Sequence, residues 1–405
     1  METMSAPRSY FDHAATTPMR REAVAAMLPL LDGGGFNASA LYAEGRAARA
    51  ALDGARAVVA GLIGARPREI VFTGSGSEAD NLAIVGVVRA AKRAAAHVVT
   101  AATEHYAVLH AVEELRDEGV EVTVLGVDGA GRVDPADFAA ALRPQTVLAT
   151  IMLANNELGT LAPIAELARI ARTRGVVFHC DAVQAAGRLP LCVDALGVDL
   201  LTLAAHKCYG PKGVGALYVR AGTPLRPLAV GGAQEAGRRA GTENVAGIAG
   251  FAAAFAASEA ERPAEMLRVA ELRDRLEHAV LAAISGTRVN AAGVPRLASV
   301  ASIAFADVDA AELLVRLDLC GFAVSTGSAC AAGAAERSHV LAALEAPNWV
   351  RRGTLRFSLG RLTGVQDVER LVRMLPEAVA SMRVASLNVG KSVGGFSQSH
   401  SEVFS

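Results

Sequence analysis

One stretch of the chain predicts the fold: Glu69-Ile70-Val71-Phe72-Thr73-Gly74-Ser75-Gly76-Ser77-Glu78-Ala79. Its first residues are mostly β-branched or aromatic and predict a strand, a Gly/Ser turn follows, and 77–94 has the apolar periodicity of a helix. The same order recurs at three later places: His97–Ala101 with 105–118, Val120–Leu125 with 134–142, and Gln145–Leu153 with 163–174. Strands that alternate with helices in this way predict an α/β protein with a mostly parallel sheet.

The rest of the chain predicts the end of this sheet and a second domain. Three more strands, at Val176–Asp181, Val198–Ala204 and Val214–Val219, bring the predicted sheet to seven strands. An apolar run at 245–258 predicts a buried helix. A charged helical stretch at 262–285 then ends the alternation of strands and helices, so we expect a domain boundary near residue 260. Beyond it the sequence predicts a smaller α+β domain with elements at Ser299–Phe305, 309–319, Phe322–Ser325, 337–345, Thr354–Leu359 and 365–383.

We therefore expect residues 15–260 to form a large domain and residues 1–14 with 261–385 to form a small one. The Ser- and Gly-rich tail at 386–405 has little periodicity, and we expect it to be disordered.

Composition excludes several classes of protein. The chain has 40 basic and 41 acidic residues, and its basic clusters are only short pairs, so direct nucleic-acid binding has no electrostatic support. The longest apolar run is too short to cross a bilayer, and residues 1–12 lack the features of a secretory signal. Five cysteines without a C-x-x-C pair predict neither a disulfide framework nor a metal site. We expect a cytoplasmic protein with reduced thiols.

The Gly/Ser turn at 74–79 is a candidate phosphate site. It lies between a predicted strand and a predicted helix, where backbone N–H groups and hydroxyls gather at a helix N-terminus. The string also fits G-x-G-x-x-A, the dinucleotide fingerprint, but no acidic residue closes the next predicted strand near Ala101, where a ribose partner is expected. A turn that binds nothing is the remaining alternative.

Two ionisable residues end predicted strands of the same sheet. Lys207 follows the strand Val198–Ala204, where its amine could form a Schiff base, although a solvated loop lysine is the simpler alternative. Asp181 ends an apolar strand, where a carboxylate is costly unless it meets a cation or hydrogen-bond donors, and an arginine or a helix cap could also satisfy it. A phosphate site, a lysine and a carboxylate on one sheet are the protein groups that pyridoxal 5′-phosphate requires.

Ordered motifs from about Tyr10 to Arg383 make the chain resemble the cysteine desulfurases of the NifS/IscS type, within the class V aminotransferase family. The resemblance implies the type I fold of pyridoxal-phosphate-dependent transferases. The motifs are Phe11-Asp12-His13-Ala14-Ala15-Thr16-Thr17-Pro18, Glu104-His105-Tyr106-Ala107-Val108-Leu109, Asn155-Asn156-Glu157-Leu158-Gly159, Asp181-Ala182-Val183-Gln184, Ala205-His206-Lys207, Arg239-Ala240-Gly241-Thr242, Gly327-Ser328-Ala329-Cys330 and Leu355-Arg356-Phe357-Ser358-Leu359-Gly360.

The resemblance implies roles around the cofactor ring. Lys207 would form the Schiff base, and Asp181 would pair with the pyridine nitrogen. Gln184 would donate a hydrogen bond to the ring oxygen. His105 would stack on the ring and move protons. Taken alone, a histidine such as His105 is more often an ordinary residue at a helix start.

The resemblance also implies how the phosphate and the substrate are held. Gly76, Ser77 and His206 would bind the phosphate, and Thr242 would reach it from the second subunit of a homodimer. Asn156 would contact cofactor and substrate, and Arg356 would bind the substrate carboxylate, a task that suits its planar fork. A turn asparagine and a surface strand arginine are the local alternatives for these two residues.

Cys330 lies in a small-residue segment, Ser325-Thr326-Gly327-Ser328-Ala329-Cys330-Ala331-Ala332-Gly333. The resemblance implies that Cys330, as thiolate, takes the sulfur of L-cysteine as a persulfide, that alanine leaves, and that the sulfur passes to an acceptor protein of iron–sulfur cluster assembly or thiolation. No metal site is expected, apart from transient iron–sulfur ligation by Cys330. We expect the other cysteines Cys180, Cys192 and Cys320 to be small buried hydrophobes.

Three positions depart from the family pattern and leave alternatives open. Ala204 replaces a serine that usually binds phosphate, so we expect weaker cofactor retention, by about 1.5–3 kcal/mol. Ala236 stands in place of a common arginine and Tyr42 in place of a common histidine, so dimer contacts or substrate entry can differ. A selenocysteine lyase, a transaminase or an inactive scaffold subunit are the alternatives.

Overall fold

The structure is a computed structural model that describes residues 8–33, 36–92, 95–327 and 338–393, with side chains described as far as Val384. The expected tail falls partly outside this range, because residues 394–405 are not described. None of the helices in the described part of the chain is long and apolar enough to cross a membrane.

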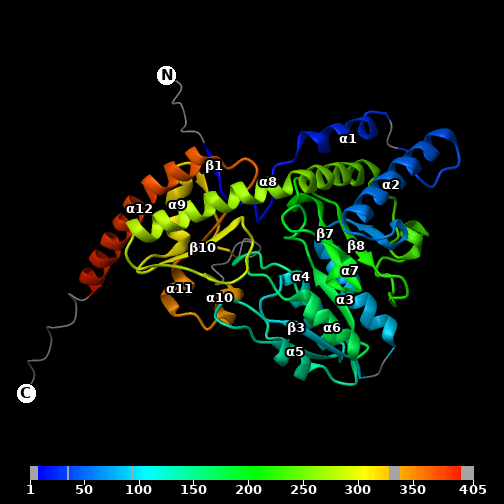
Figure 1. Ribbon diagram of the computed structural model, residues 1–405, viewed down its shortest axis with the longest axis horizontal. Coiled ribbons are helices and arrows are strands. Elements are labelled where there is room, and N and C mark those ends of the chain that lie inside the picture. The colour runs from blue at the N-terminus through cyan, green and yellow to red at the C-terminus, as the bar shows by residue number, and fades with distance from the viewer. Residues whose placement is uncertain (1–7, 34–35, 93–94, 328–337, 394–405) are drawn as a thin grey trace, which may run out of the picture.

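A seven-stranded sheet forms the centre of the larger part (Figure 1). Its strand order is β2-β8-β7-β6-β5-β3-β4, and β8 alone runs antiparallel to its neighbours, which confirms the mostly parallel sheet predicted from the sequence. The strands are β2 (Ile70–Thr73), β3 (His97–Ala101), β4 (Glu121–Leu125), β5 (Thr146–Thr150), β6 (Val177–Asp181), β7 (Leu200–Ala204) and β8 (Gly215–Val219). Since all but β8 point the same way, their carboxyl ends meet at one edge of the sheet.

Apolar side chains cover both faces of this sheet. In β2, Ile70 and Phe72 belong to one buried cluster and Val71 to another, because successive strand residues point to opposite faces. This explains why the strands are continuous apolar runs in the sequence. One cluster includes residues of α2 (Ala43–Leu62), α5, α6 and α8 (Val245–Ala283), and the other includes residues of α3 and α4. Four of these helices are α3 (Gly76–Ala91), α4 (Tyr106–Asp117), α5 (Pro135–Ala141) and α6 (Ile164–Thr173).

Helix α8 (Val245–Ala283) passes from one part of the molecule into the other (Figure 1). Its first half carries Phe251 and Phe255 into the core beside the large sheet, and its second half carries Leu272 and Leu276 into a separate core. The sequence predicted two helices here, but the structure has one, which continues through Pro263. The domain boundary near 260 therefore falls inside a helix and stays a prediction.

The smaller part is built on an antiparallel sheet of three strands in the order β12-β10-β9. Its elements are β9 (Thr287–Val289), β10 (Val300–Phe305), α9 (Ala310–Leu319), β11 (Phe322–Ala323), α10 (His339–Ala343), α11 (Asn348–Gly353), β12 (Thr354–Ser358) and α12 (Val365–Val393). The N-terminal strand β1 (Ser9–Tyr10) pairs with β11. Helix α12 extends past its predicted end at 383 to Val393, so the first part of the expected disordered tail is helical.

Helices α1 (Arg21–Leu31) and α2 (Ala43–Leu62) lie at the end of the molecule away from the small sheet (Figure 1). The sequence analysis did not predict them. Helix α1 packs closely on α8, since a Cβ added at Gly250 would lie 2.6 Å from the Met27 sulfur. Its other side leaves apolar side chains exposed, with exposed fractions of 45% for Val24, 58% for Leu28 and 65% for Leu31.

One buried ion pair fastens α2 to the sheet. The Arg56 guanidinium donates to both Glu235 carboxylate oxygens, at 2.6 and 2.7 Å, and to the Ile70 carbonyl at 2.8 Å. Glu235 also accepts from the Phe72 N–H at 2.9 Å, and the Arg56 guanidinium lies 4.8 Å from the Phe72 ring centroid. Glu235 and its neighbour Ala236 have positive φ angles, 49° and 57°, which this pair helps to hold.

We predict that Arg56→Ala lowers the free energy of unfolding by about 3 kcal/mol, because it leaves the Glu235 carboxylate buried without its cation. Arg49→Ala on the same helix is the matched control, since it removes only the exposed ion pair with Asp53 and should change stability by about 0.5 kcal/mol or less. Denaturant unfolding of both variants measures the difference. Equal effects would contradict the assigned role of the buried pair.

Candidate functional site

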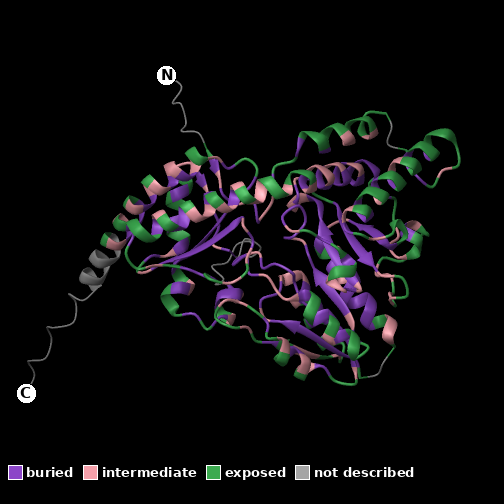
Figure 2. Cartoon of the chain, in the orientation of Figure 1, coloured by how far each residue is buried: buried purple, intermediate pink, exposed green. Residues whose placement is uncertain are grey.

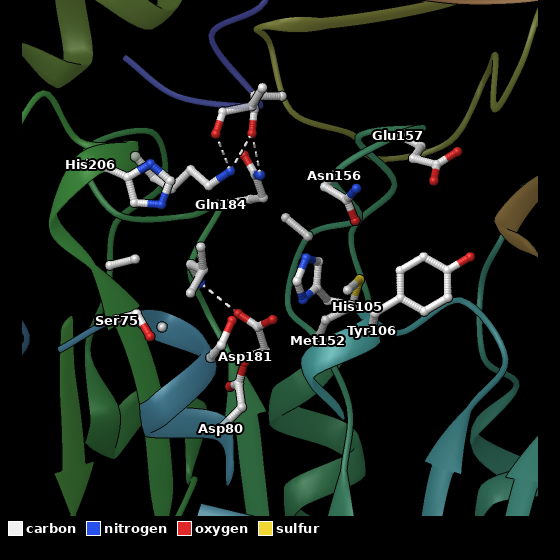
Figure 3. A pocket seen from close by; sticks show the side chains of 18 of the residues that line it. Ser75, Asp80, His105, Tyr106, Met152, Asn156, Glu157, Asp181, Gln184 and His206 are labelled. Carbon is white, nitrogen blue, oxygen red and sulfur yellow. Dashed lines mark hydrogen bonds between the residues drawn. The ribbon is translucent and has the colours of Figure 1, made fainter. Parts of the chain in front are cut away.

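A cavity of about 290 Å³ opens at the edge where the parallel strands end (Figure 3). This volume is close to the lower end of the range of roughly 300–1,000 Å³ that small-molecule sites occupy. Most of the residues that the sequence analysis selected line it. They are Gly76, Ser77, His105, Asn156, Asp181, Gln184, His206, Lys207 and Arg356.

The first wall of the cavity is the N-terminus of α3. Ser75 caps this helix by accepting a hydrogen bond from the Glu78 N–H at 3.0 Å, and Ser77 is exposed in its first turn. A Cβ at Gly76 would lie 2.9 Å from Val183 and 3.3 Å from the Ala204 methyl, so only glycine lets the helix approach the sheet this closely. The first N–H groups of a helix lack intrahelical partners and attract anions, which fits a phosphate.

Lys207 and His206 enter the cavity from the short turn that follows β7. The Lys207 amine donates to the backbone carbonyls of Ala14, at 2.6 Å, and Ala15, at 2.7 Å. His206 Nδ1 lies 3.1 Å from the Thr16 hydroxyl. Burial, followed by the positive charge of Lys207, lowers the pKa of His206 to about 4. His206 is therefore neutral at pH 7 and can offer a ring nitrogen without adding charge.

Buried carboxyl groups form the floor of the cavity. Asp181 accepts a hydrogen bond from the Val183 N–H at 2.8 Å, and burial raises its pKa to about 6. Burial, followed by the nearby Asp181 carboxylate, raises the pKa of Asp80 well above its usual range, and burial does the same for Glu104, which is not among the residues that line the cavity. Within the described residues, one oxygen of Asp80 and one of Glu104 have no hydrogen-bond partner. A cation at the cavity floor would stabilise Asp181, as a protonated ring nitrogen can.

His105 stands beside this floor and faces the cavity (Figure 3). It caps helix α4, and its Nδ1 accepts from the Ala107 N–H at 3.1 Å, so the proton of the neutral ring is on Nε2. Burial, and then the charge of Lys207, lower the pKa of His105 to about 4. His339, which the sequence analysis missed, also lines the cavity, and its ring centroid lies 4.5 Å from that of Tyr106.

Arg356 comes to the cavity from β12 and is only 2% exposed. Its guanidinium donates to the Asn156 carbonyl at 2.8 Å and to Asp12 at 2.7 Å. The sequence analysis missed Asp12, a carboxylate already paired with the arginine expected to bind a substrate carboxylate. A substrate would therefore either share the guanidinium with Asp12 or replace it.

Gln184 is held by hydrogen bonds at both ends of its amide. Its Nε2 donates to the Ala14 carbonyl at 2.9 Å, and its Oε1 accepts from Arg188 at 3.1 Å. One amide hydrogen remains for another acceptor, which agrees with the expected contact to a ring oxygen without testing it.

Some predicted residues are not brought to the cavity, or lie outside the described residues. Thr242 is exposed and is not among the residues that line the cavity. Cys330 lies outside the described residues. Cys180 is buried as expected, but Cys192 is exposed and Cys320 is half-buried, so the expectation of a buried hydrophobe is wrong for Cys192 and only partly right for Cys320. Within the described residues, no three His, Cys, Asp or Glu side chains form a group that could hold a metal ion.

The comparisons with known proteins identify the family. A model of the family "Aminotransferase class-V" matches residues 9–371, and the chain belongs to this family. Within it, a protein named "Cysteine desulfurase IscS" from Dictyoglomus turgidum (strain DSM 6724 / Z-1310) is 45% identical over 377 residues, which cover 93% of this chain and 96% of that relative. The resemblance to the cysteine desulfurases is thereby confirmed.

Solved structures agree with this assignment. A structure described as "NIFS-LIKE PROTEIN" superposes with a TM-score of 0.86 at 30% identity, covering 92% of this chain and 99% of that one. Another, "SspA in complex with cysteine", has a TM-score of 0.76 at 33% identity and covers 87% and 98% of the two chains. The fold is therefore the type I fold of pyridoxal-phosphate enzymes, and the enzyme depends on pyridoxal 5′-phosphate.

The residues that line the cavity fit this cofactor independently of the comparisons. An anion site at the start of α3, an amine at Lys207 and a buried carboxyl at Asp181, for which the described residues supply no ion pair, lie around one space. The Ala204 methyl, at the end of β7, offers no hydrogen bond to a phosphate, so the weaker retention expected from this departure stays a prediction.

The pH dependence of the stability difference between wild type and Asp181→Asn tests the protonation state of Asp181. In the cofactor-free protein its pKa is about 6, whereas the ordinary value is 3.8, so between these values the native state keeps a proton that the unfolded chain has lost. Native stability therefore falls as the pH rises through this range. The Asp181→Asn variant lacks this proton, and we predict that its stability relative to wild type increases between about pH 4 and pH 6.

Urea unfolding of the cofactor-free proteins at several pH values measures this change. The cofactor-loaded proteins supply the comparison, because there the carboxylate should be stabilised and wild type should be favoured at neutral pH. A stability difference that does not vary with pH in the cofactor-free proteins would contradict the raised pKa.

Proposed function

We propose that this protein is a cysteine desulfurase that converts L-cysteine to L-alanine and takes up the sulfur as a persulfide on Cys330. The observation that carries the proposal is the meeting of Lys207, Asp181, His105 and Arg356 around one cavity. The family and the relatives named cysteine desulfurase support the same reaction. None of the comparisons favours a selenocysteine lyase, a transaminase or an inactive scaffold.

Residues on three walls of the cavity would hold the cofactor. The start of α3, with Gly76 and Ser77, would bind the phosphate together with His206. Asp181 would pair with the ring nitrogen, and Gln184 would donate to the ring oxygen. When bound through Lys207, pyridoxal 5′-phosphate supplies an electron sink that weakens bonds at the substrate carbon next to the amine.

The chain's own residues orient the substrate and move its protons. Arg356 and Asn156 face the cavity and would fix the substrate carboxylate, which sets the direction in which the substrate sulfur points. His105 and Lys207 would carry protons. The neutral imidazole keeps its hydrogen on Nε2, and the Lys207 amine lines the same cavity, which supports this role.

The sulfur step is a displacement at the substrate sulfur. The Cys330 thiolate forms an S–S bond, and the bond between that sulfur and the substrate carbon breaks. Carbon keeps the bonding electrons and takes up a proton, so that alanine is the product. The sulfur then passes from Cys330 to an acceptor protein of iron–sulfur cluster assembly or thiolation, in a reducing compartment such as the cytoplasm, where thiols stay free.

A homodimer would complete the site. Val24, Leu28 and Leu31 are spaced so that they share one face of α1, and this face is exposed (Figure 2). An apolar helix face on the outside of a protein is typical of an interface. We propose that a second copy covers it. In such a pair the exposed Thr242 of each chain would contribute to the phosphate site of the partner.

One prediction of the proposed function concerns the reaction. Incubation of the cofactor-loaded protein with L-cysteine should release alanine and add the mass of one sulfur atom to the chain, and Cys330→Ser should prevent the mass gain. Intact mass spectrometry and alanine quantification measure both. Alanine release with an unmodified Cys330 would contradict the persulfide step, and absence of alanine would overturn the proposed activity.

Another prediction of the proposed function concerns the dimer. The double substitution Leu28→Arg and Leu31→Arg should convert a dimer to a monomer, because it places charges in the proposed interface. Leu319→Arg on α9 is the matched control, since Leu319 is 83% exposed and lies in the other part of the molecule. Sedimentation measures the masses. A wild-type monomer, or a dimer that survives the double substitution, would overturn this interface.

A further inference from the structure

Glu157 contacts both described residues that border the segment containing Cys330. The segment 328–337 begins after Gly327 and ends before Ser338. The Ser338 hydroxyl donates to Glu157 Oε2 at 2.5 Å. On the other side, a Cβ added at Gly327 would lie 2.6 Å from the same oxygen, so the Gly327 backbone rests against the carboxyl group. One buried side chain thus joins two residues that ten positions of the chain separate.

Glu157 is itself held firmly by the turn on which it lies. The Asn155 side-chain oxygen accepts from the backbone N–H groups of Glu157 and Leu158, each at 2.9 Å, and the Asn155 amide donates to the Thr103 carbonyl at 3.0 Å. Glu157 is only 4% exposed. The carboxyl group therefore has little freedom, and it can act as a fixed point for the groups it binds.

Gly327 is suited to this contact by its backbone as well as by its size. Its φ is +95°, a conformation that side chains rarely adopt. Its N–H donates to the Ser325 hydroxyl at 3.1 Å, and its carbonyl lies 3.5 Å from the Arg356 guanidinium, which also holds the Asn156 carbonyl. The first border of the segment is thus fixed beside the arginine expected to bind the substrate.

The Ser338 hydroxyl makes two hydrogen bonds. Its oxygen accepts from the Leu341 N–H at 3.0 Å and caps α10, while its hydrogen goes to Glu157. The next residue, His339, lines the cavity. The second border of the segment is therefore fixed at the cavity as well.

We propose that Glu157 is a positioning residue for sulfur transfer, which holds both borders of the Cys330 segment at the cavity so that the thiol reaches the substrate sulfur. The inference rests on the proposed function and adds a residue to it. Fixing the two residues that border a segment lowers the entropy cost of bringing a group between them to a bound substrate. Glutamine has the same shape as glutamate and keeps a side-chain oxygen that can accept from Ser338, so it is the conservative substitute.

The test compares Glu157→Ala with Glu157→Gln in the cofactor-loaded enzyme. The glutamine keeps an oxygen that accepts from Ser338, and the alanine does not. We expect Glu157→Ala to slow single-turnover persulfide formation on Cys330 by about tenfold to a hundredfold, and Glu157→Gln to restore most of the rate. The affinity for L-cysteine, followed by its change in the visible spectrum, should stay within about twofold in both variants, since no proposed substrate contact is removed.

Two further variants separate positioning from loss of stability. Ser338→Ala frees one border and removes the cap of α10, and it should also slow persulfide formation. Asp309→Ala removes an equivalent cap, from the Ala311 N–H on α9, without touching Glu157, and it should leave the rate unchanged. A Glu157→Ala enzyme with the wild-type rate, or one that loses affinity and rate together, would overturn the proposal. A Glu157→Gln enzyme as slow as the alanine variant would do so too.

Hydrogen exchange gives a readout that does not depend on turnover. In the protein without substrate, amides at 325–327 and 338–341 should exchange faster in Glu157→Ala than in Glu157→Gln or wild type. If wild type makes no persulfide, the proposed function fails, while the exchange comparison still decides whether Glu157 holds both borders. Unchanged exchange at both places would refute the contact itself.

Discussion

The rest of the structure depends on the shared direction of six strands. Because β2, β3, β4, β5, β6 and β7 all point the same way, the residues at their carboxyl ends gather at one edge of the sheet. The start of α3, the turn with Lys207 and the carboxyl of Asp181 meet there although they are far apart in the sequence. The cavity exists because of this geometry, and its chemistry is set by the residues that stand at the strand ends.

Much of the fold could be predicted because strands buried on both faces are plain apolar runs. The ends of the seven strands of the large sheet lie within three residues of the predicted ends. Helices α1 and α2 were missed: α1 contains Pro29, and α2 contains Gly45, Gly54 and Gly61, which are residues of low helix propensity. The short strand β9 has too few residues to show alternation. Helix α8 was divided in two because its halves are buried by different cores and so differ in composition.

The site was predictable where chemistry is local and missed where partners are distant. Lys207, Asp181 and His105 stand at strand ends or helix starts, which sequence patterns reveal. Asp12 reaches Arg356 across 344 positions, and Glu157 reaches Ser338 across 181, and no single-sequence pattern connects such pairs. The sequence also did not reveal buried acids such as Asp80. The pKa of Asp80 is raised by burial and by the Asp181 carboxylate, which is distant in the chain.

Helix α8 has a consequence for how the protein comes apart. One continuous rod supplies side chains to two separate hydrophobic cores, so neither core can lose its packing without disturbing a helix on which the other depends. The two parts are thus thermodynamically linked, and melting of one should propagate into the other instead of leaving a folded half behind. Cooperative unfolding of the two cores therefore comes from a helix that both cores share, and it does not require a large interface between them.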